Sequence, residues 1–336
     1  MDSLYTTNKI IFDYFSFTIK NVEPEFIIDM LGMECCTFID NPGSKGYHHR
    51  YYFDGISILF GGRDEVWCEM SGQGCRSFES FGSGDWFYLA YQVATNSKAQ
   101  MTRIDIAYDD FNGLLDLNAI LDDVHSYSWV SVARNVTEYI ERTLSGVSGT
   151  TVMFGNRGAN IACRIYDKAK ERNRDDEIDH WVRCELQIRH KHADNFLYYL
   201  LADECKQIYG YDLDVTNRLD SLYFAVLNHF LRFIDMAAND DSNRWRKPLS
   251  THWSRFIGSY RSGNLSLYSA PGVDYNLLKL RYVVENHMGG ALYTYINIIG
   301  VDELLTVLEP KKFNLNKKYQ ALLDRQRLKE GALCGS

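Results

Sequence analysis

Three segments of the chain alternate apolar and charged residues with a period of two, the spacing of a β-strand whose two faces differ. They are Thr102–Asp109, Cys163–Lys168 and Val182–Arg189. Each segment has one apolar face, suited to packing against helices, and one face rich in charge. Antiparallel sheets commonly bury one face and leave the other in water. The alternation therefore predicts an antiparallel sheet with a hydrophobic side and an open, charged side.

The rest of the chain supplies more strands, in hairpin pairs, with helices between them. Asp54-Gly55 separates two runs of aromatic and apolar residues and predicts a tight hairpin. Aromatic residues, which strands favour, make up 14% of the chain. Apolar residues at helical spacing mark helices around 85–94, 193–206 and 218–235. We therefore expect an α+β fold with a mainly antiparallel, curved β-sheet, helices on one face of it, and a small helical C-terminal region.

Charge is unevenly distributed along the chain. Residues 244–336 contain 14 basic and 7 acidic side chains, a net charge of +7, so residues 1–243 carry −15 and the whole chain −8. The polar stretch Ala237–Pro248 lies where the sign changes and is typical of a linker. We predict a main domain over 1–238, a linker over 239–250 and a basic helical region over 251–336. That region suits DNA binding or dimerisation, and a solvated lysine-rich helix is the alternative.

Two classes of protein are not expected from this sequence. The N-terminus has no basic stretch followed by an apolar one, and no run of about 18 apolar residues occurs, so we expect a cytoplasmic protein without a membrane span. The 8 cysteines form no CxxC pair. We expect reduced, buried thiols and no zinc site or disulfide framework.

The charged faces of the three alternating segments carry a distinctive set of side chains. A face that is only solvated would hold a mixture of Lys, Glu, Thr and Ser, whereas these faces hold short carboxylates, arginines and a tyrosine. A tyrosine hydroxyl becomes a nucleophile once it is activated, and a metal held by carboxylates can activate it toward a phosphate. Arginine and lysine can neutralise the charge that builds up on the phosphate. The residues are Arg103, Asp105, Ala107 and Asp109 on the first face, Arg164, Tyr166 and Lys168 on the second, and Arg183, Glu185, Gln187 and Arg189 on the third.

The carboxylates on these faces are the candidate metal ligands. Oxygen ligands alone favour Mg²⁺ or Mn²⁺ over zinc. Four residues at about 3.3 Å each separate Asp105 from Asp109 by about 13 Å along a straight strand. We therefore expect Asp105 to act with Glu185. Asp109 joins them only if a bulge bends its strand; otherwise it supports the site, caps a turn or faces DNA.

Five motifs follow one another along the chain: Ser71–Arg76, Arg103–Asp110, Thr151–Arg157, Arg164–Glu171 and Arg183–Arg189. In this order they resemble the replication initiation factor family (Rep_trans). This family contains rolling-circle initiators of phages and plasmids and relaxases of conjugative transposons, and its filamentous-phage branch of RstA-like proteins looks nearest. The resemblance covers roughly residues 10–235. It implies a metal-dependent, sequence-specific endonuclease of the bacterial host cell that nicks and closes DNA through a tyrosine linked to the 5′ phosphate.

The resemblance also assigns roles to residues. It implies that Tyr166 is the nucleophile, that Asp105 and Glu185 hold the metal, and that Lys168 and Arg183 steady the phosphate. Implied partners are origin DNA, single-stranded or folded into a hairpin, a host helicase and a second copy of the chain. The candidate DNA contacts are Arg76, Arg103, Arg157, Arg164, Arg189, Arg246 and Lys247.

Other interpretations stay open at the level of sequence. A non-catalytic DNA-binding regulator could keep the same fold, but it would have no need for short carboxylates facing phosphates. A tyrosine recombinase would need an Arg- and His-rich site, which we cannot assemble here. Around Trp245 and Trp253, aromatic and basic residues interleave, which suits either DNA contact or packing of the linker against the body. A second active tyrosine could be Tyr108, Tyr139 or Tyr209.

Overall fold

The computed structural model describes residues 7–144, 146–156, 158–201, 215–267 and 288–315, and the single positions 284 and 323. The chain forms two compact units, Met1–Leu267 and Tyr268–Ser336. Each unit is described by itself.

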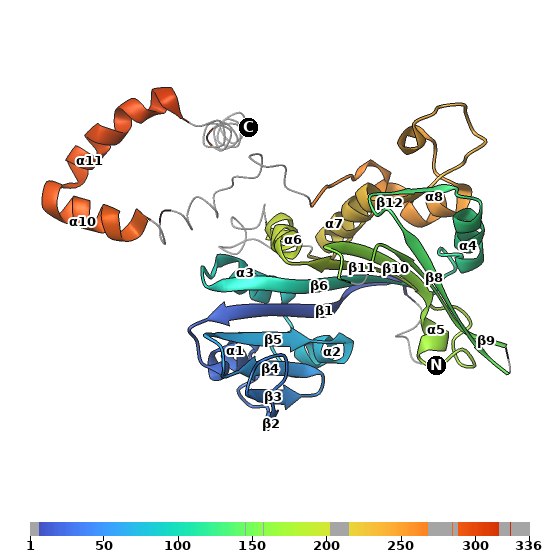
Figure 1. Ribbon diagram of the computed structural model, residues 1–336, viewed down its shortest axis with the longest axis horizontal. Helices are drawn as coiled ribbons and strands as arrows, with labels where there is room; N and C mark the ends of the chain where they lie inside the picture. The colour runs from blue at the N-terminus through green and yellow to red at the C-terminus, as the bar shows by residue number, and fades with distance from the viewer. Residues whose placement is uncertain are drawn as a thin grey trace. The chain divides into compact units, whose positions relative to one another are not determined.

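The first unit is built on a ten-stranded antiparallel sheet with the strand order β2-β3-β4-β5-β1-β6-β11-β10-β9-β8 (Figure 1). The three alternating segments fall in β6, β10 and β11, which are neighbours in this order. Two short strands, β7 (Trp129–Ser131) and β12 (Leu231–Phe233), pair separately. The strands of the large sheet are β1 (Lys9–Lys20), β2 (Ile39–Pro42), β3 (His49–Phe53), β4 (Ile56–Phe60), β5 (Glu65–Met70), β6 (Ala99–Asp110), β8 (Val136–Thr143), β9 (Gly146–Phe154), β10 (Ile161–Asp167) and β11 (Val182–Arg189).

Helices bury the apolar face of this sheet. Phe15, Ile106 and Leu186 from the sheet belong to one continuous core with Phe78 and Phe196 from two of the helices. The predicted α+β class with a mainly antiparallel sheet is therefore confirmed. The helices of this unit are α1 (Pro24–Leu31), α2 (Gly72–Phe81), α3 (Trp86–Thr95), α4 (Leu117–His125), α5 (Lys168–Glu171), α6 (Lys191–Leu201), α7 (Val215–Phe230) and α8 (Thr251–Ile257).

Local signals fix where several of these helices begin. Pro24 occupies the first turn of α1, where its missing N–H costs nothing. The carboxylate of Asp85 accepts a hydrogen bond from the backbone N–H of Tyr88 and caps α3. Asp116 caps α4 in the same way through the N–H groups of Asn118 and Ala119.

The large sheet consists of two halves with the same topology. In the first half, strands β1, β5, β4, β3 and β2 lie in that order from the centre outward; in the second half the order is β6, β11, β10, β9 and β8. Each half starts with its central strand, continues through a helix and three outer strands, and returns beside the central strand before another helix. The central strands β1 and β6 pair antiparallel. The halves are therefore related by an approximate two-fold axis through the sheet, a repeat that the sequence did not reveal.

The predicted linker is part of the first unit, so the predicted domain boundaries are wrong. Arg244 Nη2 donates a hydrogen bond to the carbonyl oxygen of Trp129 over 3.0 Å. Trp253 is completely buried, and its ring lies 4.8 Å from Phe233 and 4.9 Å from Phe256. Residues 239–267 therefore complete the core of the first unit, and the boundary between the units follows Leu267.

The described part of the second unit is helical. It contains α10 (Gly289–Ile299), α11 (Val301–Leu308) and a 3-10 helix over Glu309–Asn314. No single helix in the described residues is long and apolar enough to cross a membrane. The segments Gly289–Ile299 and Val301–Lys311, bent by 116° relative to each other, meet the length and composition test only as a pair.

Candidate functional site

Strands β6, β11 and β10 are neighbours, so their charged faces form one surface. We call this surface the charged face. The strand register decides which of its side chains meet, because directly opposed residues in an antiparallel pair lie about 5 Å apart. The opposed pairs are Asp105 with Gln187, Ala107 with Glu185, Asp109 with Arg183, Glu185 with Arg164, and Arg183 with Tyr166.

Tyr166 is buried against the carboxylate of Glu185. Its hydroxyl donates a hydrogen bond to Glu185 Oε2 over 3.2 Å, and Arg164 forms an ion pair with Oε1 of the same carboxylate. Tyr166 is 7% exposed and Glu185 is fully buried. Burial and the charge of Glu185 raise the pKa of Tyr166 above its ordinary value, and Arg183 offsets this only in part. The hydroxyl thus has a proton acceptor beside it but stays protonated at neutral pH with protein groups alone.

Asp105 is the second buried carboxylate of this cluster. Arg103 Nε donates a hydrogen bond to Asp105 Oδ1 over 2.7 Å. Burial raises the pKa of Asp105 to about 7; the bond from Arg103 lowers it, and the charge of Glu185 adds to the rise. The charge of Glu185 thus opposes ionisation of Asp105, and a divalent cation between two such carboxylates would favour the ionised form of Asp105.

The carboxylate pair fits one kind of metal. Among the described residues, no group of three or more His, Cys, Asp and Glu side chains is arranged to hold a metal ion. Mg²⁺ is commonly bound through one or two carboxylates, with water and substrate phosphates completing its coordination. Asp105 and Glu185 therefore suit Mg²⁺ or Mn²⁺ bound together with a phosphate.

Arg183 is held by two carboxylates. Its Nε and Nη2 donate to Asp109 over 2.7 and 2.8 Å, and its Nη1 lies 2.7 Å from Asp13 Oδ1. Trp181 Nε1 donates to the same Asp109 over 2.8 Å. The pairing of β6 with β11 shows no bulge, so Asp109 stays apart from Asp105. Asp109 is bound to Arg183, as expected of a residue that supports the site, and its assignment as a third metal ligand stays a prediction.

Sequence reasoning missed Asp13. A β-bulge in β1 follows Phe12 and makes Asp13 the extra residue. Beside the bulge, the carbonyl oxygen of Phe12 accepts a hydrogen bond from Arg76 Nη2 over 2.7 Å. Burial raises the pKa of Asp13, but the charges of Arg183, Lys168 and Arg76 and a hydrogen bond from Arg183 together outweigh burial, so the pKa is lowered. The signal that could have found this residue is a single acidic side chain inside an otherwise apolar strand.

Three hollows follow the charged face on both sides of Tyr166, with volumes of about 280, 400 and 360 Å³. The middle hollow is lined by Tyr166, shares Arg164 with the first and shares Lys168 with the third. The ammonium of Lys168 is almost wholly buried and lies 2.7 Å from Glu171. Burial and the charge of Arg183 lower the pKa of Lys168. The third hollow adds basic residues that the sequence did not single out: Lys9, Arg172 and Arg174.

Four of the arginines predicted to contact DNA line the first or the third hollow. Arg103, Arg164 and Arg189 line the first hollow, where Arg189 Nη2 donates to Gln187 Oε1 over 3.1 Å. Arg76 lines the third hollow. Arg157 lies outside the described residues.

The two basic residues predicted from the linker have different surroundings. Lys247 is buried, and its ammonium donates to the carbonyl oxygens of Met236 and Asn239. Its assignment as a DNA contact is therefore wrong, because the charge is used to hold the chain. Arg246 is exposed and pairs with Asp241 over 3.0 Å.

The three tyrosines considered as a second nucleophile lie in different parts of the chain. Tyr108 lies in the core on the opposite side of the sheet, 5.1 Å from the ring of Phe256. Tyr139 lines the first hollow on the charged face. Tyr209 lies outside the described residues.

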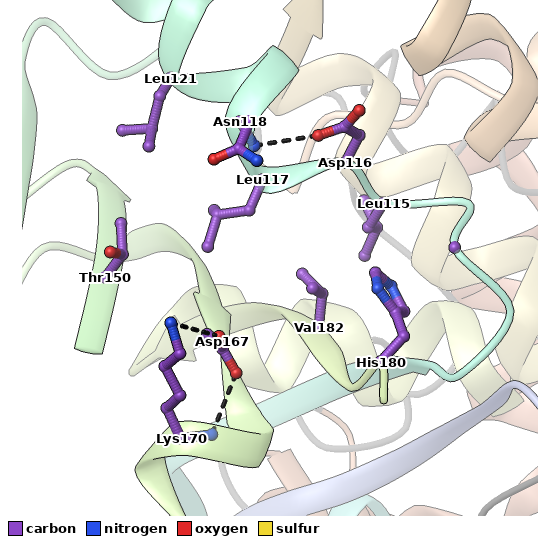
Figure 2. A pocket seen from close by; sticks show the side chains of 11 residues that line it. Leu115, Asp116, Leu117, Asn118, Leu121, Thr150, Asp167, Lys170, His180 and Val182 are labelled. Carbon is purple, nitrogen blue, oxygen red and sulfur yellow. Dashed lines mark hydrogen bonds and ion pairs between the residues drawn. The ribbon is translucent and has the colours of Figure 1, made fainter. Parts of the chain in front are cut away.

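A fourth hollow, of about 390 Å³, lies beside α4 and α5 (Figure 2). Leu117, Leu121 and Val182 form its apolar part. Lys170 pairs with Asp167 over 3.6 Å, and the backbone N–H of Lys170 donates to the same carboxylate. None of the site residues predicted from the sequence lines this hollow. The charged face is therefore the stronger candidate site.

Comparison with known proteins agrees with this organisation. A model described as "Rolling Circle replication initiation protein N-terminal domain" matches residues 9–88, and one described as "Replication initiation factor" matches residues 99–303. The border between the two matches falls between the two halves of the sheet.

Two individual proteins are similar to the chain. The candidate DNA relaxase NicK of Bacillus subtilis (strain 168) is 29% identical over 246 residues, which is 69% of this chain and 65% of that protein, just under two thirds of its length. A solved structure of a rolling circle replication initiator protein from Geobacillus stearothermophilus aligns with a TM-score of 0.64 at 24% identity, covering 78% of this chain and 100% of that one. The second likeness shows the fold. The match of the replication initiation factor model over more than half of the chain shows that this protein belongs to that family.

Proposed function

We propose that this protein initiates rolling-circle replication by nicking one strand of origin DNA through Tyr166 and later rejoining the ends. The observation that carries the proposal is the hydrogen bond from the Tyr166 hydroxyl to Glu185, inside a cluster of two carboxylates and several cations. Such a cluster suits a nucleophile that must lose its proton next to a phosphate. The candidate relaxase among the relatives supports the same reaction class.

In the proposed reaction, Tyr166 Oη attacks the phosphorus of a phosphodiester and the bond from phosphorus to the 3′ oxygen breaks. The proton of Tyr166 passes to Glu185, and the leaving 3′ oxygen takes up a proton from solvent. Arg164 and Lys168 neutralise charge on the phosphate oxygens. The reverse attack by a 3′-OH on the phosphotyrosine rejoins the strand.

Asp105 and Glu185 are the proposed ligands of Mg²⁺ or Mn²⁺. When bound, such an ion polarises the phosphate oxygens and favours the phenolate. This effect would offset the rise in the pKa of Tyr166 that burial and the charge of Glu185 cause. Arg183 is assigned a positioning role, because its guanidinium is buried and forms ion pairs with Asp109 and Asp13.

The proposed substrate is a single strand or hairpin of origin DNA lying along the three hollows. Arg103, Arg164 and Arg189 would contact its backbone on one side of Tyr166, and Arg76, Arg172 and Arg174 on the other. A host helicase and a second copy of the chain stay predicted partners, because they rest on the family resemblance alone.

The test uses labelled single-stranded fragments covering the genetic element that encodes the chain. We expect a covalent protein–DNA adduct on a denaturing gel with Mg²⁺ or Mn²⁺, and none with EDTA or with Tyr166→Phe. Tyr88→Phe, an exposed tyrosine on α3, is the matched control and keeps the adduct. An adduct that survives in Tyr166→Phe but is lost in Tyr139→Phe would move the nucleophile to Tyr139. Tight DNA binding without any adduct or nick would favour a non-catalytic regulator.

A further inference from the structure

The repeated topology of the sheet continues down to single residues. Val66-Trp67-Cys68-Glu69-Met70 in β5 and Val182-Arg183-Cys184-Glu185-Leu186 in β11 are identical at three of five positions, and both strands return beside the central strand of their half. Glu69 therefore corresponds to Glu185, and Trp67 corresponds to Arg183. The two-fold axis is perpendicular to the sheet, because the central strands are antiparallel neighbours, and it therefore does not exchange the two faces of the sheet. Glu69 and Trp67 thus lie on the same side of the sheet as the charged face.

The first half lacks the side chains proposed for the reaction. Leu59 lies opposite Trp67 as Tyr166 lies opposite Arg183, so a buried leucine stands in the position of the nucleophile. Ser57 lies opposite Glu69 in the position that Arg164 holds beside Glu185. Tyr14, directly opposite Asp105 across the central strands, takes the position of that carboxylate. This half repeats the geometry of the site without its chemistry.

The same side of the first half carries aromatic rings covered by cations. Lys45 Nζ lies 4.1 Å from the centre of the Trp67 ring, and the guanidinium of Arg50 lies 5.3 Å from that of Tyr52. A third pair joins the first half to the charged face, because the guanidinium of Arg103 lies 4.2 Å from the ring of Tyr14. Aromatic rings interleaved with cations are the pattern that binds nucleic-acid bases and phosphates.

Three details distinguish this surface from a merely solvated one. The indole nitrogen of Trp67 and Nε of Arg50 are buried, and neither has a hydrogen-bond partner in the described part of the chain. Tyr52 is 36% exposed although its ring is large and flat. The carboxylates present are already neutralised: Glu69 pairs with Lys45 over 2.8 Å, and Glu65 lies 3.8 Å from Arg63. These pairs leave the surface open to an anionic ligand.

We propose that the first half of the sheet is a non-catalytic copy of the nicking half that binds the DNA flanking the nick, with bases stacked on Trp67 and Tyr52 and phosphates held by Arg50. The proposal rests on the proposed nicking function, since the charged face guides the strand to this surface. Trp67 lies four strands from Tyr166, about 19 Å across the sheet at the usual strand spacing. The two residues are also offset along the strands, because Trp67 lies in register with Thr18 of β1 and Tyr166 in register with Lys9, which adds roughly 30 Å at about 3.3 Å per residue. Only DNA that extends several nucleotides beyond the nick can reach it.

The test measures how binding depends on the length of the strand. Fluorescein-labelled oligonucleotides of about 8 and about 24 nucleotides are titrated with the full chain and followed by anisotropy. They are centred on the nicked position or, if no nick forms, on the middle of the fragment that the protein binds most tightly. We expect the longer strand to bind the wild-type protein more tightly, and Trp67→Ala and Tyr52→Ala to weaken its binding about tenfold each. Arg50→Gln, which keeps most of the side chain's packing, should weaken it as well. Tyr88→Ala, at a tyrosine on α3 that is even more exposed than Tyr52, is the control.

The outcomes separate this proposal from the proposed function. If the three variants bind the longer strand as tightly as Tyr88→Ala while the wild-type protein still forms the covalent adduct, the surface does not bind DNA and a protein partner becomes the better explanation. If no adduct forms but the length dependence and its loss in the variants are seen, the surface is a DNA-binding surface and the nicking function fails. Circular dichroism of every variant excludes unfolding as the cause of weak binding.

Discussion

At the scale of single residues, this protein buries Asp105, Asp109, Arg183 and Glu185 on one side of a sheet, and each of them lies in an ion pair. Arg183 illustrates the principle, since two carboxylates bind a guanidinium that is only 3% exposed. Removing one partner from a buried ion pair costs far more than the pair contributes, because the remaining charge has no solvent to receive it.

Asp109→Asn is therefore expected to destabilise the fold. The change removes the negative charge that holds Arg183 and leaves Asp13 as its one carboxylate partner among the described residues. We expect a loss of about 3 kcal/mol in the free energy of unfolding, measured by urea denaturation. Asp122→Asn, at an exposed position on α4, should change it by less than about 0.5 kcal/mol. Equal stability of the two variants would contradict the structural role of Asp109.

Asp110 should make stability depend on pH. Burial opposes ionisation of this carboxyl, but hydrogen bonds from His180 and from the N–H groups of Leu115 and Asn112 outweigh it, and the pKa is lowered. A lowered folded-state pKa stabilises the protein above the unfolded-state value of about 3.9 and ceases to do so as the pH falls through the folded-state value.

The difference in unfolding free energy between wild type and Asp110→Asn is thus expected to be largest above about pH 5 and to shrink toward pH 3. Urea denaturation at a series of pH values measures it. A difference in unfolding free energy that stays constant over this pH range would show that the lowered pKa of Asp110 does not contribute to stability.

At the scale of elements, strand register and one bulge determine which charges meet. The bulge in β1 gives Asp13 to Arg183, and the segment after β12 places Lys247 inside the fold. The neighbouring residues Arg246 and Lys247 therefore have different roles: Lys247 binds backbone carbonyl oxygens inside the fold, and Arg246 pairs with Asp241 at the surface.

Lys247→Ala and Arg246→Ala should separate stability from surface charge. Lys247 donates to carbonyl oxygens that would be left without this charged donor, so we expect a loss of about 2 kcal/mol in the free energy of unfolding. Arg246 pairs with Asp241 at the exposed surface, and such pairs contribute at most about 1 kcal/mol. Thermal unfolding of both variants checks this. A larger loss in Arg246→Ala than in Lys247→Ala would show that Lys247 is not needed to hold this segment in place.

At the scale of the whole molecule, the first unit ends at Leu267 and includes residues that the charge pattern assigned to another domain. Truncation after residue 267 should leave a chain that unfolds cooperatively near the melting temperature of the full protein. Truncation after residue 238 removes Trp253, Phe256 and Ile257 from the core. At about 2 kcal/mol for each buried side chain, this loss is comparable with the whole stability of a typical domain.

Differential scanning calorimetry and limited proteolysis of the two truncated chains measure the difference. Protease resistance of the 1–238 chain equal to that of the 1–267 chain would restore the boundary predicted from the sequence.

The sequence by itself determined the strands and their two faces, because alternation is a local property that each strand carries whatever its neighbours are. It likewise determined the kind of chemistry on the charged face, since the carboxylates, arginines and tyrosine are visible at every second position of β6, β10 and β11.

Only the tertiary structure decided which of these side chains meet. Asp109 pairs with Arg183, Asp13 pairs with the same arginine from a position 96 residues before Asp109, and Lys247 is buried. The repeat of the two sheet halves also became visible only in the strand order. The reason is that register, bulges and long-range packing depend on contacts between distant segments, which no local period encodes.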